Sequence, residues 1–151
     1  MRDFGVHLCQ LAPQGGHLTA ATAVNFDKRT YQPIDAIDKV SCRPDFAVPV
    51  YPGYLRVTDK DELAPSVRHI SDGTPPFLIV HGNDDPFGGS NVANSVLMYL
   101  ALRRAGVTAG LHVFATARHG FGVRQSDHPV SAWTQLCANW LRDQGLLKPK
   151  S

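Results

Sequence analysis

The hydrophobic pattern of this chain centres on one short apolar segment, residues 77–80, which reads Phe-Leu-Ile-Val. Two prolines precede the segment and Gly82 follows it closely, so the pattern predicts a strand that is buried on both faces of a parallel sheet. Residues 111–114, Leu-His-Val-Phe, form a second candidate strand that leads into a glycine-rich loop. Because ligands and catalytic groups collect at the carboxyl ends of strands in open α/β sheets, we expect the loops after these two strands to lie at the functional edge.

Two more segments have a strand pattern. Phe46, Val48 and Val50 alternate with small residues and are followed by a Pro-Gly turn, which predicts a strand over residues 44–51. Residues 4–11 hold a short apolar patch that is also compatible with a strand.

Apolar residues recur at helical spacing in two places, residues 90–105 and residues 130–141. The first pattern ends in two arginines and a glycine, the usual order at a helix C-terminus, and Ser90 or Asn91 is expected to cap its start. A third segment, residues 18–25, is rich in small residues and compatible with a helix that packs close to a sheet.

The remaining stretches, residues 27–43 and 55–72, have no sustained period and are interpreted as irregular connections. The first has room for one helical turn, and no core is expected in the second. The order of strands and helices predicts the α/β class, with a mostly parallel sheet flanked by helices in a single domain over residues 1–151.

Composition narrows the class of protein. The hydrophobic fraction of 43% and the charged fraction of 19% are globular values, and a net charge of +2 is too small to indicate nucleic acid as a partner. No apolar run approaches the roughly 20 residues that a membrane helix needs, and no signal-peptide pattern opens the chain. The three cysteines, Cys9, Cys42 and Cys137, are far apart and odd in number, so we expect free thiols in a cytoplasmic protein without a metal or cofactor.

The candidate chemistry lies in the two loops at the expected functional edge. Asp84 and Asp85 follow the first central strand, and His119 lies in the loop after the second. A carboxylate that binds one nitrogen of a histidine fixes its tautomer and stabilises the imidazolium, so the pattern indicates two members of a hydrolytic triad. His17 and His81 are interpreted as structural, because one follows two glycines and the other ends a strand.

These motifs together resemble the C-terminal half of α/β-hydrolase-fold esterases, in the acetyl-esterase and dienelactone-hydrolase-like branch. The likeness covers about residues 12–147, and the motifs that carry it are His-Gly-Asn-Asp-Asp-Pro at 81–86, Leu-Ala-Leu-Arg-Arg-Ala-Gly at 100–106 and His-Gly-Phe-Gly at 119–122. The resemblance implies that Asp85 is the triad acid and His119 the general base. Asp84 stays open as a solvated neighbour or a turn former.

The sequence departs from this family at the nucleophile. The family's elbow reads G-x-S-x-G-G-H, a strained turn that presents the serine beside the oxyanion hole. Residues 11–17 read L-A-P-Q-G-G-H, so Pro13 occupies the serine position, and Gln14 and Gly15 occupy the elbow and oxyanion positions after it. Proline carries no nucleophile, and its fixed φ and missing N–H suit this turn poorly. The opening strands of the family and its HGGG-type loop have no counterpart in the sequence.

The nucleophile is therefore unknown. The substitutes considered are Cys9, Ser90, Thr116 and Ser126; Cys9 lies within a candidate strand, Ser90 is a candidate cap, and the other two flank the loop of His119. The sequence favours a carboxylic-ester hydrolase with an incomplete triad that acts on small acyl esters. The alternative is an inactive hydrolase remnant that serves as a binding or oligomerising protein, or a gene fragment.

The half-length resemblance also has a consequence for assembly. Without the family's opening strands, residues 4–11 or 46–51 would form an uncovered sheet edge beside exposed apolar faces. We therefore expect a homo-oligomer, most simply a two-fold dimer. The other expected partner is a small-molecule ester that serves as the substrate.

Overall fold

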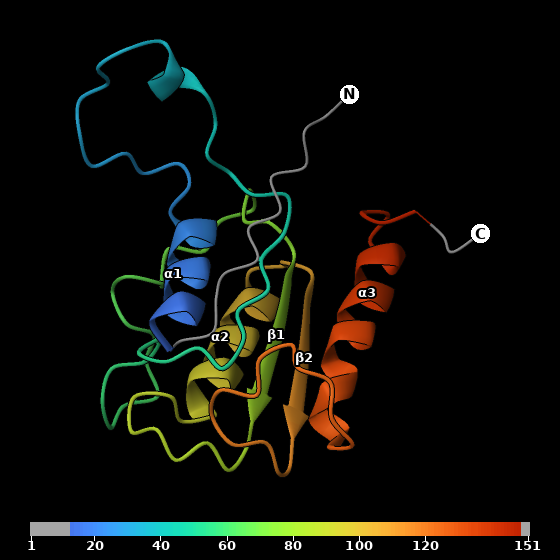
Figure 1. The fold of residues 1–151 in the computed structure, drawn as a ribbon. Helices are drawn as coiled ribbons and strands as arrows, with labels where there is room; N and C mark the ends of the chain where they lie inside the picture. Colours follow the sequence, from blue (N-terminus) through green and yellow to red (C-terminus); the bar gives the residue numbers. More distant parts are fainter. Residues whose placement is uncertain (1–12, 149–151) are drawn as a thin grey trace.

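The computed structural model describes residues 13–148, and its centre is a parallel sheet that lies between helices (Figure 1). Two strands form the regular part of the sheet, β1 (Phe77–Gly82) and β2 (Ala109–Phe114), and they pair in parallel from Phe77 opposite Ala109 onward. The α/β class and the parallel sheet flanked by helices are thus confirmed.

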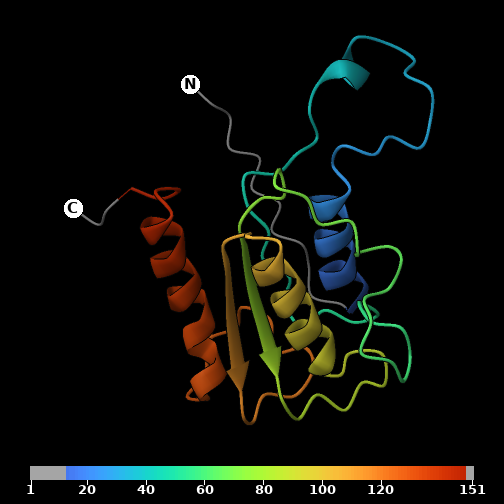
Figure 2. The ribbon, with the colours of Figure 1, turned by 180° about the vertical axis from the view of Figure 1, so that it is seen from behind.

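Helices cover both faces of the sheet (Figure 1, Figure 2). α1 (Pro13–Val24) and α2 (Ala93–Arg104) pack on one face, and α3 (Trp133–Asp143) packs on the other. Residues 13–148 also contain two short 3-10 helices, η1 (Ile37–Lys39) in the connection after α1 and η2 (Pro129–Ala132) immediately before α3. Within residues 13–148, no helix is long and apolar enough to cross a membrane.

β1 is the centre of the hydrophobic core because its two faces are both covered. Phe77 and Ile79 pack against α1 and α2, while Leu78 and Val80 pack against α3. All four side chains are fully buried. This is why the sequence of β1 is continuously apolar and does not alternate between apolar and polar residues.

The predicted strand over residues 44–51 runs parallel to β1 but is not continuous. Bridges join Ala47 to Phe77 and Val50 to Val80, on the edge of β1 that is not paired with β2. Between the two bridges lies Pro49, which has no N–H to donate to the sheet. The segment therefore pairs with β1 through two separate bridges and forms a third, interrupted strand at the edge of the sheet.

The first residues of two helices differ from those expected, while one of the two cap candidates of α2 does bind the start of that helix. α2 begins after Asn91, whose side-chain oxygen accepts a hydrogen bond from the backbone N–H of Ala93 at 2.8 Å. Ser90, the other candidate cap, is buried and donates its hydroxyl to the carbonyl oxygen of Tyr51 at 2.9 Å instead. α1 begins at Pro13, where a proline is well tolerated because the first N–H of a helix has no partner within it.

The expectation that residues 55–72 hold no core is wrong. Leu55 and Val67 are both completely buried and belong to the core on the α1 and α2 face of the sheet. The segments around them hold few other apolar residues and no sustained period, so no pattern marks them as core. The small side chains of α1, such as Ala20 and Ala23, pack in the same cluster.

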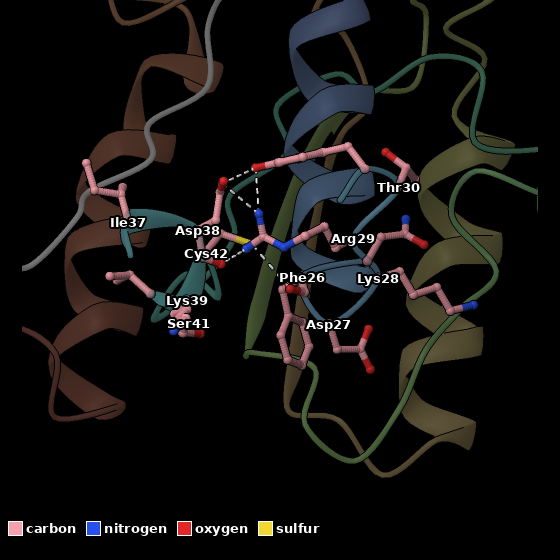
Figure 3. A pocket seen from close by; sticks show the side chains of 13 residues that line it. Phe26, Asp27, Lys28, Arg29, Thr30, Ile37, Asp38, Lys39, Ser41 and Cys42 are labelled. Atoms are coloured by element: carbon pink, nitrogen blue, oxygen red, sulfur yellow. Dashed lines mark hydrogen bonds and ion pairs between the residues drawn. The ribbon is translucent and has the colours of Figure 1, made fainter. Parts of the chain in front are cut away.

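Residues 25–42 form an arm that projects from the end of the sheet opposite to the carboxyl ends of the strands (Figure 1). Arg29 holds the arm together by donating to Asp38 at 2.8 Å and to the Tyr31 hydroxyl at 2.6 Å (Figure 3). The hydroxyl of Tyr31, more than any other group, lowers the pKa of Asp38 to about 2. The arm encloses a hollow of about 510 Å³ that is remote from the predicted catalytic edge.

Candidate active site

The loops that follow β1 and β2 are joined at the carboxyl edge of the sheet. A side chain at Gly82 would place its Cβ 1.5 Å from the carbonyl oxygen of Ala117, so the two backbones approach in a way that only glycine permits. The backbone N–H of Asn83 also donates to the carbonyl oxygen of Phe114 at 2.8 Å. The residues after the two strands therefore have a defined position relative to each other.

The structure brings Asp85 and His119 together at this edge. Nδ1 of His119 lies 2.6 Å from Oδ2 of Asp85, and the side chains are 19% and 1% exposed. The other carboxylate oxygen, Oδ1, accepts a hydrogen bond from the backbone N–H of Phe87 at 2.9 Å. No hydrogen-bond partner of His119 Nε2 is found among residues 13–148. Because Nδ1 holds the carboxylate, Nε2 is the nitrogen that can exchange a proton with a substrate or nucleophile.

Asp84 has a separate task, which sequence reasoning missed. Its Oδ1 accepts a hydrogen bond from the backbone N–H of Ala117 at 2.6 Å, two residues before His119. The two roles considered for Asp84, a solvated neighbour or a turn former, do not include this bond. The two adjacent carboxylates thus have different roles. Asp84 binds the backbone of the loop that carries His119, and Asp85 binds the imidazole of His119.

His81 lies behind Asp85 and is completely buried. Its Nε2 lies 2.7 Å from the Ser90 carbonyl oxygen, which can only accept, so Nε2 carries the proton and Nδ1 accepts from the Ser95 hydroxyl at 2.6 Å. Burial lowers the pKa of His81 and outweighs the opposite effects of the Ser90 carbonyl and the Asp85 charge. A neutral His81 in this network fits the structural role expected for it.

Two aromatic side chains that the sequence did not single out contact His119. The ring of Tyr51 lies 4.6 Å from the imidazole between centroids, and the ring of Phe87 lies 5.1 Å away, nearly parallel to it. Tyr51 is followed by the Pro-Gly turn that ends the third segment of the sheet, so its place at a carboxyl end was readable from the sequence. The contact between Tyr51 and His119 could not be read from the sequence.

The three residues that the resemblance placed at the elbow, Pro13, Gln14 and Gly15, form the first turn of α1. The next residue, Gly16, would place a Cβ 2.7 Å from the Cα of Pro52. This close approach sets the start of α1 against the end of the segment that carries Tyr51, at the same edge as the Asp85–His119 pair. His17 also lies near this turn, with Nδ1 3.3 Å from the Gly53 carbonyl oxygen.

The candidate substitute nucleophiles are placed as follows. Ser90 is buried and already donates its hydroxyl to the Tyr51 carbonyl oxygen, which leaves it unsuited to attack a substrate. Thr116 and Ser126 line a cavity of about 470 Å³ together with His119, and the hydroxyl of Ser126 lies 2.9 Å from that of Ser131. Cys9 lies outside the described residues. Within residues 13–148, no three His, Cys, Asp or Glu side chains gather closely enough to hold a metal ion.

In α/β hydrolases, the acid and the histidine of the triad lie at the carboxyl ends of parallel strands, and the arrangement of Asp85 and His119 fits this class. Within this class, the model of the prolyl oligopeptidase family matches residues 45–145. The chain belongs to this family. No match is found among the curated proteins.

Solved structures of esterases have the same fold. An acetyl ester-xyloside bifunctional hydrolase from Caldicellulosiruptor lactoaceticus is 31% identical with a TM-score of 0.76, over 89% of this chain and 55% of that one. Esterase 2 of Thermogutta terrifontis is 26% identical with a TM-score of 0.68, over 90% and 55%. The carboxylesterase Cest-2923 from Lactobacillus plantarum WCFS1, 19% identical with a TM-score of 0.64 over 90% and 57%, has a similar fold. The expected resemblance to α/β-hydrolase esterases is confirmed, and the chain spans about half the length of these proteins.

Proposed function

We propose that this chain carries the acid and the base of an ester-hydrolysing site. The observation that supports the proposal is the hydrogen bond between Asp85 and His119, 2.6 Å long, at the carboxyl edge of the sheet. Both residues match the motif positions of the triad acid and base in esterases of this fold. Membership of a hydrolase family supports an ester-hydrolysing activity, and the activity and the roles of the two residues are both part of the proposal.

In this proposal His119 moves protons and Asp85 orients it. The carboxylate holds Nδ1–H, so Nε2 is free to take the proton of an attacking hydroxyl or thiol as that group bonds to the ester carbonyl carbon. The imidazolium then returns the proton to the leaving alcohol oxygen as the ester bond breaks. Water repeats the two steps on the acyl intermediate and releases the acid. The adjacent negative charge of Asp85 stabilises the imidazolium in both halves of the reaction.

We propose small acyl esters as substrates, without a cofactor. The similar structure from C. lactoaceticus is described as a hydrolase of acetyl esters and xylosides, which favours a short acyl group.

The second candidate function is a hydrolase remnant without turnover that binds a partner or a ligand. One observation favours it: the residue at the position of the family's serine is Pro13, and it starts α1. Loss of a triad serine leaves only about 10³–10⁴-fold acceleration over water. A chain of this kind would keep the fold while its inherited chemistry is nearly absent.

Hydrolysis of p-nitrophenyl acetate by the wild type and by the variants His119→Ala and Asp85→Ala distinguishes the two functions. A working site predicts losses of about 10²–10⁴-fold in the two variants, the range for a general acid–base group. Equal rates for all three proteins, at equal folded fractions, would remove the enzymatic proposal. Labelling with a fluorophosphonate or iodoacetamide and mapping by mass spectrometry would identify the nucleophile of an active wild type.

A gain-of-function variant tests whether Asp85 and His119 can act together in catalysis, even if the wild type is inactive. Pro13→Ser restores a hydroxyl at the family's nucleophile position, and we expect at least tenfold faster hydrolysis that is lost again when His119→Ala is added. Gln14→Ser is the matched control, because it adds the same hydroxyl one position further along α1. Failure of Pro13→Ser to exceed Gln14→Ser would mean that Asp85 and His119 do not form a competent pair in this chain.

A further inference from the structure

Tyr51 combines features that a packing residue does not need. It is completely buried, yet its backbone has a φ of 36°, in the left-handed region that residues with a bulky side chain seldom adopt. Hydrogen bonds hold the backbone there: its N–H donates to the Val80 carbonyl oxygen at 2.7 Å, and its carbonyl oxygen accepts from Ser90 at 2.9 Å. Strained residues of this kind persist only where the surroundings enforce them, and they cluster at functional sites.

The hydroxyl of Tyr51 is also unusual. It is buried, and no hydrogen bond of standard geometry reaches it among the described residues. Burial raises the pKa of this phenol, and the Gly122 backbone, which lies near the hydroxyl, opposes the shift only in part. Tyr51 is therefore a neutral phenol held by its backbone and by ring contacts, and its hydroxyl contributes little to its position.

The ring contacts of Tyr51 lead to His119. The Tyr51 ring lies 4.6 Å from the imidazole at an interplanar angle of 59°, and 4.8 Å from the ring of Phe121 in an edge-to-face arrangement. Phe87 lies 5.1 Å from the same imidazole at 27°. Phe87 also donates its backbone N–H to Asp85, so the carboxylate that binds the imidazole also positions one of its aromatic neighbours.

We propose that Tyr51 is a positioning residue for His119, with Phe87 as the second member of an aromatic clamp. One hydrogen bond to Asp85 does not by itself fix the two side-chain torsion angles of His119, and a flip of the ring about χ2 would turn Nδ1 away from the carboxylate. Two rings packed against the imidazole remove that freedom, because an aromatic pair favours particular relative orientations. The clamp thus keeps Nδ1–H on Asp85 and sets the direction of Nε2. The inference rests on the proposed function of His119, but its test does not require turnover.

The clamp is supported from the core. Ser90 binds the carbonyl oxygen of Tyr51, and the carbonyl oxygen of Ser90 in turn accepts from Nε2 of His81. Ser95 completes this chain of hydrogen bonds on the other nitrogen of His81. Every side chain in this chain of bonds is buried, so the strained backbone of Tyr51 has a rigid support.

Nitrogen NMR of ¹⁵N-histidine-labelled protein tests the proposal, with the His119 signals assigned from His119→Gln. In the wild type we expect the tautomer with the proton on Nδ1. Tyr51→Leu removes the ring but keeps an apolar side chain, and we expect the minor tautomer of His119 to rise about two- to tenfold, the range of an aromatic pair contact. Tyr51→Phe keeps the ring and is expected to preserve the wild-type tautomer.

Phe46→Leu is the matched control, because it changes a buried aromatic ring in the same segment and the same core cluster, away from His119. Phe87 is 45% exposed, so Phe87→Leu tests the second ring even if Tyr51→Leu does not fold. An unchanged His119 tautomer in folded Tyr51→Leu and Phe87→Leu would overturn the inference. Because the readout is spectroscopic, an inactive wild type would count against the proposed function and leave this result intact.

Discussion

Nδ1 of His119 lies 2.6 Å from Oδ2 of Asp85, and the carboxylate side chain is 1% exposed. The second carboxylate oxygen is held by the backbone N–H of Phe87, so the acid cannot turn away from the imidazole without losing a second hydrogen bond. The geometry that a general base requires is therefore present before any substrate binds, which is how electrostatic preorganisation acts in enzymes.

Mutations of the two neighbouring carboxylates, Asp84 and Asp85, should have different effects. Asp84→Ala leaves the buried Ala117 without a partner for its N–H, and we expect a loss of about 1–3 kcal/mol in the free energy of unfolding while His119 keeps its tautomer. Asp85→Ala should abolish the tautomer preference. Urea unfolding and imidazole NMR of both variants measure the two effects. A tautomer change of equal size in both would show that the roles are not divided.

His81 should make stability depend on pH. Burial lowers its pKa below the ordinary value of 6.5, so below pH 6.5 the unfolded chain binds a proton that the folded chain does not, until the folded-state pKa is reached. This contribution to stability is fully present above about pH 6.5 and is lost as the pH falls, by at most about 1.4 kcal/mol per pH unit. Urea unfolding between pH 5 and 8 measures the slope. His81→Gln should flatten it, and an unchanged slope in that variant would exclude His81 as the source.

The close approach of the two site loops should make Gly82 irreplaceable. Gly82→Ala forces a Cβ to 1.5 Å from a backbone oxygen, and we expect a loss of 3 kcal/mol or more, roughly the upper range for overpacking, or failure to fold. Gly110→Ala is the control, since its Cβ would meet the end of the Leu78 side chain at 2.9 Å. A flexible side chain can move, so a smaller loss is expected. Thermal melting compares the two, and equal melting temperatures would contradict the argument.

The connection between residues 55 and 72 should behave as part of the core. Leu55→Ala removes a completely buried side chain, and we expect a loss of about 2–5 kcal/mol in the free energy of unfolding. Ile34→Ala changes an apolar side chain that is 87% exposed on the arm, so its effect should stay within about 0.5 kcal/mol. Denaturant unfolding of both variants measures this contrast. A loss below 1 kcal/mol for Leu55→Ala would mean that the segment does not support the fold.

The homo-oligomer expected from the sequence stays a prediction. The arm gives it a physical reason, because four of its apolar side chains are more than half exposed: Tyr31, Ile34, Ile37 and Val40. We expect size-exclusion chromatography with light scattering to find a dimer at micromolar concentration, and the double variant Ile34→Asp, Ile37→Asp to shift it toward the monomer. Leu147→Asp, which alters an exposed apolar residue outside the arm, is the control. A monomeric wild type would contradict the prediction.

Local patterns in the sequence were enough to predict the class of fold and the edge of the sheet where the candidate site lies, and the family resemblance then selected Asp85 and His119. β1 is a continuous apolar run because both of its faces are buried, and a pattern of that kind is visible without a structure. The motifs around Asp85 and His119 follow two strands, and strands that run in parallel bring their carboxyl ends to one edge. The family resemblance also implied that Pro13 occupies the position of the nucleophile, which stays a prediction.

Only the tertiary structure decided how the loops at that edge support one another. The hydrogen bond from Ala117 to Asp84, the ring of Tyr51 on His119 and the burial of Leu55 each join residues far apart in the chain. Such contacts depend on where irregular connections come to lie once the sheet and helices have packed, and no periodic pattern encodes that. The sequence by itself determined the elements and the chemistry they carry, whereas packing determined which side chains hold that chemistry in place.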